Sequence, residues 1–202
     1  MYRFPVPQAA RLASFAGVES DLRAVVEYCK RLEAQWRSLG TLDFPLHEAL
    51  SAAAVIRYGR CFKQGVRQRL LEKHLNAAPS ELGHTHRYVI ELRDKHVAHS
   101  VNPFEENDVT VQISDHYVSS AEVFAVNTAH GRAVGFPSDM PAKLRALGEW
   151  WLAWLEVEIK KEKEMLVNLA KTFTLEELKR NGEVLLAADT TPHTVGKRRP
   201  RP

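Results

Sequence analysis

The sequence predicts a mainly all-α protein, an antiparallel helical bundle with a small antiparallel β insert. Apolar residues recur at helical spacing through most of the 202 residues, and the period changes to two only between about residues 108 and 136. The length suits one domain with a real core, and the composition, 45% hydrophobic and 26% charged, is that of an ordinary soluble protein. We therefore expect an N-terminal arm over residues 1–17, a helical domain over 18–188 and a disordered basic tail over 189–202.

Four helices are predicted before the insert. Their apolar spacing covers residues 18–40, 45–62, 66–78 and 80–100. Gly40 suits the C-cap of the first helix, Pro45 the first turn of the second, and Ser80 the N-cap of the fourth. Pro103 should close the fourth helix, because proline cannot continue the backbone hydrogen bonding.

The insert is predicted from alternation. The stretches VTVQI and AEVFAVNT alternate apolar and polar residues, as half-buried strands do. AHGR, at residues 129–132, has the composition of a turn, and AVGF follows it. We expect a hairpin or a three-stranded antiparallel patch over about residues 108–136.

Two helices are predicted after the insert. Ser138 should open a long helix that ends near Phe173, and Thr174 should cap a last helix over residues 174–186. Glu177, three residues after Thr174, completes a capping box. The stripe of the long helix carries aromatic as well as aliphatic residues, among them Trp150, Trp151 and Trp154. Such a stripe is typical of a core or a dimer interface.

The formal net charge of +3 belongs to one end of the chain. The last eleven residues hold four basic and no acidic residues, which leaves 24 basic against 25 acidic residues elsewhere. Outside the tail, the protein therefore has no overall positive charge to attract nucleic acid. A contact with RNA would need a local basic patch or the tail.

The sequence favours a cytoplasmic protein without a membrane partner. No apolar run approaches the roughly 18 residues that a membrane span needs, and the N-terminal residues lack the apolar segment of a signal peptide. Cys29 and Cys61 lie in predicted helices without a CxxC motif. They indicate buried free thiols rather than a disulfide or a thiolate metal site.

The stretch IELRDKHVAHSVN carries polar residues on the apolar face of its predicted helix. On an ideal helical wheel with Leu82, a residue of the apolar face, at 0°, Arg93 falls at about 20°, His86 at about 40° and His96 at about 320°, all within the apolar face. His99, near 260°, falls at the margin of that face. Burying an unpaired guanidinium costs several kcal/mol, so Arg93 needs an anion or a wet cleft beside it. A fixed cation with imidazoles suits a phosphodiester, because arginine stabilises charge on phosphorus and imidazole transfers protons.

Two other interpretations stay open at this point. Arg93 could pair with a buried acid such as Glu149 or Glu156 in a purely structural network. His96 and His99, at spacing i, i+3, could reach one metal ion, but no HExxH motif accompanies them and we predict neither a metal nor a cofactor.

ELRDKHVAHS resembles the signature of HEPN domains, an arginine followed by a polar residue and, later in the same helix, a histidine. Arg93, Asp94 and His99 match it, and ALSAAAVIRYGRCFKQGVRQRL upstream is similar to bacterial members. The resemblance implies a helical bundle that dimerises and cleaves RNA without a metal through 2′-hydroxyl attack, often in toxin, phage-defence or stress systems with an antitoxin or regulatory partner. Val101 stands where the subgroup paired with nucleotidyltransferase antitoxins has tyrosine, so we do not predict that partner.

The resulting hypothesis is a homodimeric endoribonuclease. Within it, His99 acts as general base or acid, Arg93 stabilises the phosphorane, Asp94 orients Arg93 or His99, and His96 carries a second proton or binds phosphate. Arg93 and His99 are about 120° apart on an ideal helix, so the second chain should supply the missing half of the site. The alternative is a non-catalytic HEPN-like dimer that binds a nucleotide, RNA or a protein partner.

Overall fold

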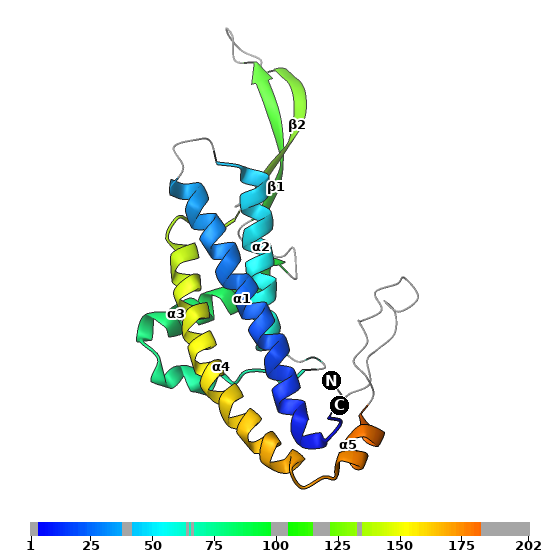
Figure 1. The fold of residues 1–202 in the computed structure, drawn as a ribbon. Helices are drawn as coiled ribbons and strands as arrows, with labels where there is room; N and C mark the ends of the chain where they lie inside the picture. The colour runs from blue at the N-terminus through cyan, green and yellow to red at the C-terminus, as the bar shows by residue number, and fades with distance from the viewer. Residues whose placement is uncertain are drawn as a thin grey trace.

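The bundle is built on a long central pair of antiparallel helices. The computed structural model describes residues 4–37, 42–63, 65, 67–97, 105–114, 122–132 and 135–182. Helix α1 (Ala10–Arg37) packs against α2 (Phe44–Arg60) and α4 (Met140–Ala170), and both run antiparallel to it (Figure 1). The shorter α3 (Ser80–Leu92) packs against α2 and α4. The predicted mainly helical bundle with a β insert is confirmed.

Helix α1 begins earlier than the sequence predicts. A 3-10 turn, η1 (Pro7–Ala9), leads into it, so residues 10–17 are helical rather than part of an arm. Phe15 is buried and makes an edge-to-face contact with Trp154, with ring centroids 6.2 Å apart. Arg11 donates to Glu158 and Glu162 near the far end of α4. These contacts with α4 extend the helix beyond the apolar pattern that begins at Val18.

The third predicted helix, over residues 66–78, is wrong. Residues 67–71 are not helical, and only a 3-10 helix, η2 (Glu72–Ala77), follows them. The Gln68 backbone N–H donates to Ser14 Oγ at 3.1 Å, and the Leu70 N–H donates to the Cys61 carbonyl at 2.8 Å. Leu70 is buried by this arrangement. Tertiary hydrogen bonds and burial therefore override a moderate local preference for helix.

The fourth predicted helix differs from the expectation at both ends. Ser80 is the first residue of α3 rather than its N-cap, which is Pro79. After Leu92 the chain continues as a π-helix, η3 (Arg93–Val97), and the predicted end near Ser100 lies outside the described residues. Short π-helical segments are rare in proteins, and those that occur are often at functional sites. This one begins at Arg93, the arginine of the candidate motif.

The insert is a two-stranded antiparallel hairpin that projects from one end of the bundle (Figure 1). Strand β1 (Glu105–Ser114) pairs with β2 (Glu122–Arg132), and Val111 lies opposite Val126. The predicted turn at residues 129–132 is wrong, because these residues belong to β2 and pair with residues 105–108. No third strand joins this sheet among the described residues, and Phe136, in the predicted AVGF strand, is instead buried against α2.

Helices α4 and α5 agree well with the sequence. Helix α4 begins at Met140, two residues after the predicted opening, and ends three residues before Phe173. The last helix, α5 (Leu175–Asn181), has Thr174 as its cap, and the predicted capping box with Glu177 is confirmed. The predicted continuation to residue 186 and the basic tail lie outside the described residues.

The core lies between α1, α2 and α4. Trp151 is fully buried, and Trp150 and Trp154 pack against the same cluster, so the tryptophan stripe is core. Cys29 and Cys61 are buried free thiols, as predicted, and burial raises the pKa of each to about 12.

A hydrogen-bonded chain ties three helices together inside the core. Trp151 Nε1 donates to the Tyr58 hydroxyl at 3.3 Å, and that hydroxyl lies 2.7 Å from His86 Nδ1. His86 is buried, which confirms its predicted inward position, and burial lowers its pKa although the nearby Glu72 opposes the shift. Burial likewise raises the pKa of Tyr58. The chain of contacts fixes α3 on α2, close to the start of η3.

Candidate functional site

Arg93 and Asp94, the first two residues of η3, form the described part of the predicted site. Arg93 Nη1 donates to Asp94 Oδ1 at 2.8 Å, and Lys63 Nζ donates to the other carboxylate oxygen at 2.5 Å. The side chains of Arg93 and Asp94 are 35% and 40% exposed, so both cations meet the carboxylate at the surface. We call Lys63, Arg93 and Asp94 the motif cluster.

Asp94 holds two cations, which gives the motif cluster a surplus of one positive charge. Partial burial opposes ionisation of Asp94, but hydrogen bonds from Lys63 and Arg93 outweigh it and lower the pKa of the carboxyl group. The carboxylate is therefore ionised at neutral pH and can orient the guanidinium of Arg93. The orienting role expected for Asp94 stays a prediction.

The stem of Arg93 packs against α2 at Gly59. A Cβ atom added to Gly59 would lie 3.0 Å from Arg93 Cγ and 3.2 Å from Cδ, so glycine leaves room for the stem. The stem of Arg93 thus turns toward the bundle, as the helical wheel predicts, but the guanidinium of Arg93 reaches the surface. The structural alternative with Glu149 or Glu156 is not found, since Arg93 pairs with Asp94 and Glu149 accepts from Arg145.

The two histidines of the motif are only partly accounted for. His99 lies outside the described residues, and of His96 the structure describes the backbone, within η3. The ideal wheel no longer applies from Arg93 onward, because a π-helix bonds i to i+5 and turns less per residue than an α-helix. The separation of about 120° between Arg93 and His99 assumed an α-helix throughout. It therefore no longer supports the expectation that a second chain supplies half of the site.

A second group of cations, which the sequence analysis missed, surrounds Asp21 of α1. Asp21 Oδ1 accepts from Arg57 Nη1 at 2.7 Å, and Oδ2 accepts from Arg67 Nη2 at 2.5 Å. Arg60 Nε lies 3.7 Å from the same Oδ2. We call Arg57, Arg60 and Arg67 the arginine cluster. The signal in the sequence was an aspartate between the apolar residues Val18 and Leu22, on the inner face of α1.

The arginine cluster holds Asp21 ionised although its side chain is only 2% exposed. Burial alone would raise the pKa of Asp21, but the hydrogen bonds from Arg57 and Arg67 and the charge of Arg60 lower it. One carboxylate thus faces three guanidinium groups, which leaves two positive charges at the surface.

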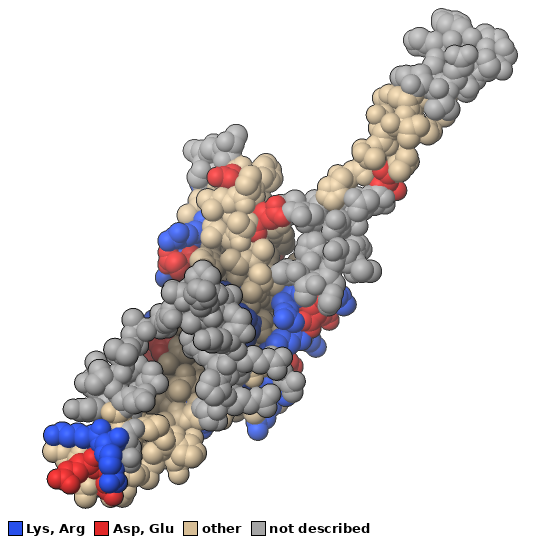
Figure 2. Space-filling model, turned by 90° about the vertical axis from the view of Figure 1, so that its right-hand side faces the viewer, with Lys and Arg blue, Asp and Glu red and all other residues tan. Residues whose placement is uncertain are grey.

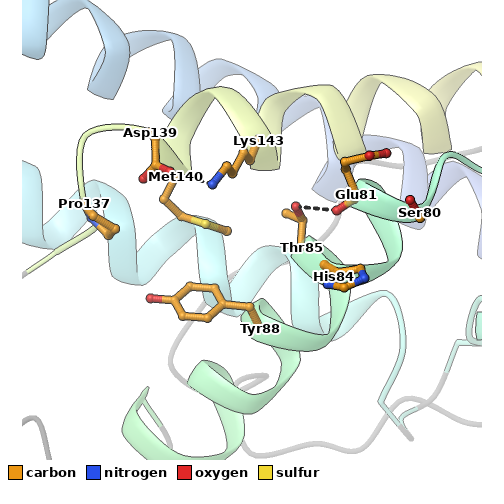
Figure 3. Close-up of a pocket in the computed structure, with 9 residues that line it drawn as sticks. All are labelled: Ser80, Glu81, His84, Thr85, Tyr88, Pro137, Asp139, Met140 and Lys143. Atoms are coloured by element: carbon orange, nitrogen blue, oxygen red, sulfur yellow. Dashed lines mark hydrogen bonds and ion pairs between the residues drawn. The ribbon is translucent and has the colours of Figure 1, made fainter.

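A pocket of about 500 Å³ lies between α3 and the start of α4. Figure 3 shows Tyr88, His84 and Thr85 from α3 facing Met140 and Lys143 of α4 across it. Its size falls in the range of small-molecule sites, and some of its polar side chains already have partners. Lys143 pairs with Asp139 at 2.5 Å, and Thr85 Oγ1 donates to the Glu81 carbonyl at 2.9 Å.

Comparison with protein-family models, with curated proteins and with solved structures finds no match to this chain. Among the described residues, no three His, Cys, Asp or Glu side chains are grouped so as to hold a metal ion. In the same part of the chain, no helix is long and apolar enough to cross a membrane.

Replacing Gly59 with alanine should disturb Arg93 and leave the fold intact. The new Cβ would push the Arg93 stem by a few tenths of an ångström. Alanine in a helix is favoured over glycine by about 1 kcal/mol, so the free energy of unfolding should stay the same or rise. Under the ribonuclease hypothesis, RNA cleavage should nevertheless fall, by roughly 3–10-fold, because Arg93 is misplaced.

Urea unfolding and an RNA cleavage assay measure the two effects separately. Gly83→Ala is the matched control, because a Cβ added at Gly83 of α3 meets nothing within 4 Å. It should stabilise the helix and leave cleavage unchanged. Equal cleavage by the Gly59→Ala variant and wild type would show that the position of Arg93 does not matter.

Proposed function

We propose that this chain is a metal-independent endoribonuclease of HEPN type. The observation that carries the proposal is the arrangement of Arg93, whose stem packs on Gly59 and whose guanidinium is oriented by Asp94 at the surface. This arginine opens the π-helical segment that includes His96, three residues before His99 in sequence. A rigidly held cation beside proton carriers is what phosphodiester cleavage needs.

The proposed reaction needs no water and no metal. His99 removes the proton of a ribose 2′-hydroxyl, and the 2′-oxygen attacks the adjacent phosphorus. Arg93 stabilises the charge that develops on the phosphorane oxygens. The bond from phosphorus to the 5′-oxygen then breaks, and that oxygen receives a proton from an imidazolium, either a second His99 or His96. The products are a 2′,3′-cyclic phosphate and a 5′-hydroxyl end.

The homodimer remains part of this proposal through the family resemblance. Two copies of the motif in one cleft would let Arg93 of one chain act with His99 of its partner. The wider roles that the resemblance suggests, in toxin or phage-defence systems with an antitoxin or regulatory protein, are further expectations of the same proposal.

A non-catalytic RNA-binding or nucleotide-binding dimer is the second candidate. It is favoured by the motif cluster itself, in which Asp94 fixes Lys63 and Arg93 as two static charges. Static cations bind phosphate groups well without any proton transfer. The two candidates differ in whether the bound RNA is recovered intact.

The decisive experiment incubates the purified protein with single-stranded and structured RNA in EDTA. Cleavage should continue in EDTA and leave 2′,3′-cyclic phosphate ends, which end-group analysis by mass spectrometry identifies. A substrate with a single 2′-deoxy ribose should resist cleavage at that position only. His99→Ala should remove the activity.

Controls separate this activity from a contaminating nuclease. His74→Ala changes a histidine whose ring packs on Trp154, remote in sequence from the motif, and should cleave like wild type. RNA bound and recovered intact would support the second candidate. Cleavage that EDTA abolishes, or that His99→Ala leaves unchanged, would contradict the proposed mechanism.

A further inference from the structure

The arginine cluster has more positive charge than its own carboxylate can balance. Asp21 hydrogen-bonds to Arg57 and Arg67, one on each oxygen. Arg60 is 52% exposed and, at 3.7 Å from Oδ2, is beyond hydrogen-bond distance. Three guanidinium groups around one carboxylate repel one another, and a bound anion would relieve that repulsion.

Helix α1 holds the arginine cluster in place through Asp21 and Gly17. Asp21 is fixed on α1, and a Cβ added to Gly17, one turn earlier, would lie 2.4 Å from Arg67 Nη1. A side chain at position 17 would therefore force the Arg67 side chain to move. Two of the cations are thus oriented before any ligand arrives, which lowers the entropy that binding must overcome.

The arginine cluster and the motif cluster adjoin at the C-terminal end of α2, which holds Arg57 and Arg60, while Lys63 follows three residues after its end. Arg57, Arg60 and Lys63 follow one another at intervals of three residues, and the Lys63 N–H still bonds to the Gly59 carbonyl at 3.1 Å. Gly59, between Arg57 and Arg60 in sequence, is also the residue on which Arg93 packs. Residues three apart on a helix are surface neighbours, so the two clusters adjoin.

Together with Asp21, the two clusters comprise five basic and two acidic side chains, Arg57, Arg60, Lys63, Arg67 and Arg93 with Asp21 and Asp94. On the face drawn in Figure 2, Lys and Arg side chains lie on the bundle in several groups, each beside Asp or Glu side chains. A surface with three excess positive charges suits a ligand with several anionic groups in a row.

We propose that the arginine cluster binds the phosphate backbone of RNA, next to the phosphate that the motif cluster contacts. The choice of RNA rests on the proposed function, whereas the choice of a phosphodiester backbone rests on the guanidinium groups. Arginine binds phosphate through two parallel hydrogen bonds, and backbone contacts hold a strand without reading its sequence. The arginine cluster therefore acts as a positioning site for the strand.

The test measures binding of a single-stranded DNA oligonucleotide, which has the same phosphates and no 2′-hydroxyl to attack. Fluorescence anisotropy gives Kd for wild type and for Arg60→Ala, across a series of salt concentrations. Arg60 is the residue to change because it makes no hydrogen bond to Asp21, so the fold should persist. We expect Kd to rise by roughly 3–10-fold, equally for different sequences, and the salt slope to fall by about 0.7, the value for one lost phosphate contact.

The control is Arg23→Ala. Arg23 is on α1, about 200° around the helix from Asp21, and pairs with Glu19 at 2.6 Å. The control variant makes the same change in net charge and should leave Kd and the salt slope as in wild type. Equal weakening by Arg23→Ala and Arg60→Ala would show a diffuse charge effect and overturn the proposal.

This test can fail separately from the proposed function. Wild-type binding of DNA that depends on Arg60, with no cleavage of RNA, would support the backbone site and contradict the endoribonuclease. Cleavage of RNA with binding that ignores Arg60 would do the reverse. Saturable binding of an acidic peptide to the same residues, without binding of either nucleic acid, would overturn the proposal in favour of a protein partner.

Discussion

Replacing Arg93 with alanine should lower kcat/KM for RNA cleavage by roughly 10²–10³-fold, the usual loss when one stabiliser of transition-state charge is removed. The effect should be this large because Asp94 and Gly59 hold the guanidinium in place before the substrate binds. A preorganised cation contributes more than a mobile one, since no reorganisation is needed during the reaction. Single-turnover cleavage of a labelled RNA measures the loss.

Two further variants make the result specific to Arg93. Arg93→Lys keeps the charge and loses the planar fork, so its activity should lie between those of wild type and Arg93→Ala. Arg87→Ala removes an exposed arginine from α3, the helix that precedes η3, and should cleave like wild type. If Arg93→Ala retained more than a tenth of wild-type activity, the assigned role would be wrong.

Replacing Asp21 with alanine should lower the free energy of unfolding by about 2–4 kcal/mol, because a buried carboxylate is removed from the cations that surround it. Arg57 and Arg67 lose their hydrogen-bond acceptor, and the segment after α2 loses its anchor to α1. The partial exposure of the arginines places the estimate below the full cost of an unpaired buried charge. Urea unfolding at neutral pH measures the difference.

The same pair of proteins should differ in how stability depends on pH. The folded protein lowers the pKa of Asp21, so the carboxylate contributes stability above the pKa of about 3.9 that it has when unfolded. That contribution is lost as the pH falls through the lower folded-state pKa. The difference between wild type and Asp21→Ala should therefore shrink steadily below pH ~4.

Asp108→Ala is the matched control for Asp21. Asp108 is an exposed aspartate of the hairpin, and its loss should change the free energy of unfolding by less than about 0.5 kcal/mol. A difference between wild type and Asp21→Ala that stayed constant down to strongly acidic pH would show that packing, not charge, explains the loss.

Local patterns predicted the regular elements well where the chain supplies its own partners. The stripe of α4 buries Trp151, and Thr174 and Glu177 satisfy each other at the start of α5. The apolar spacing and the capping box each involve residues close together in sequence, so the sequence alone is enough to predict them. Patterns failed where distant groups compete for the backbone, as Ser14 does for Gln68, and where residues 129–132 find their partners on β1.

The sequence by itself determined the helical class, the β insert and the Arg93–Asp94 motif. Only the tertiary structure decided that Arg93 packs on Gly59, that Lys63 shares Asp94, and that three arginines meet at Asp21. Asp21 is 36 residues from Arg57 and 46 from Arg67 along the chain, so no local spacing could pair them. Helix propensity acts between neighbours in sequence, whereas charge acts between neighbours in space.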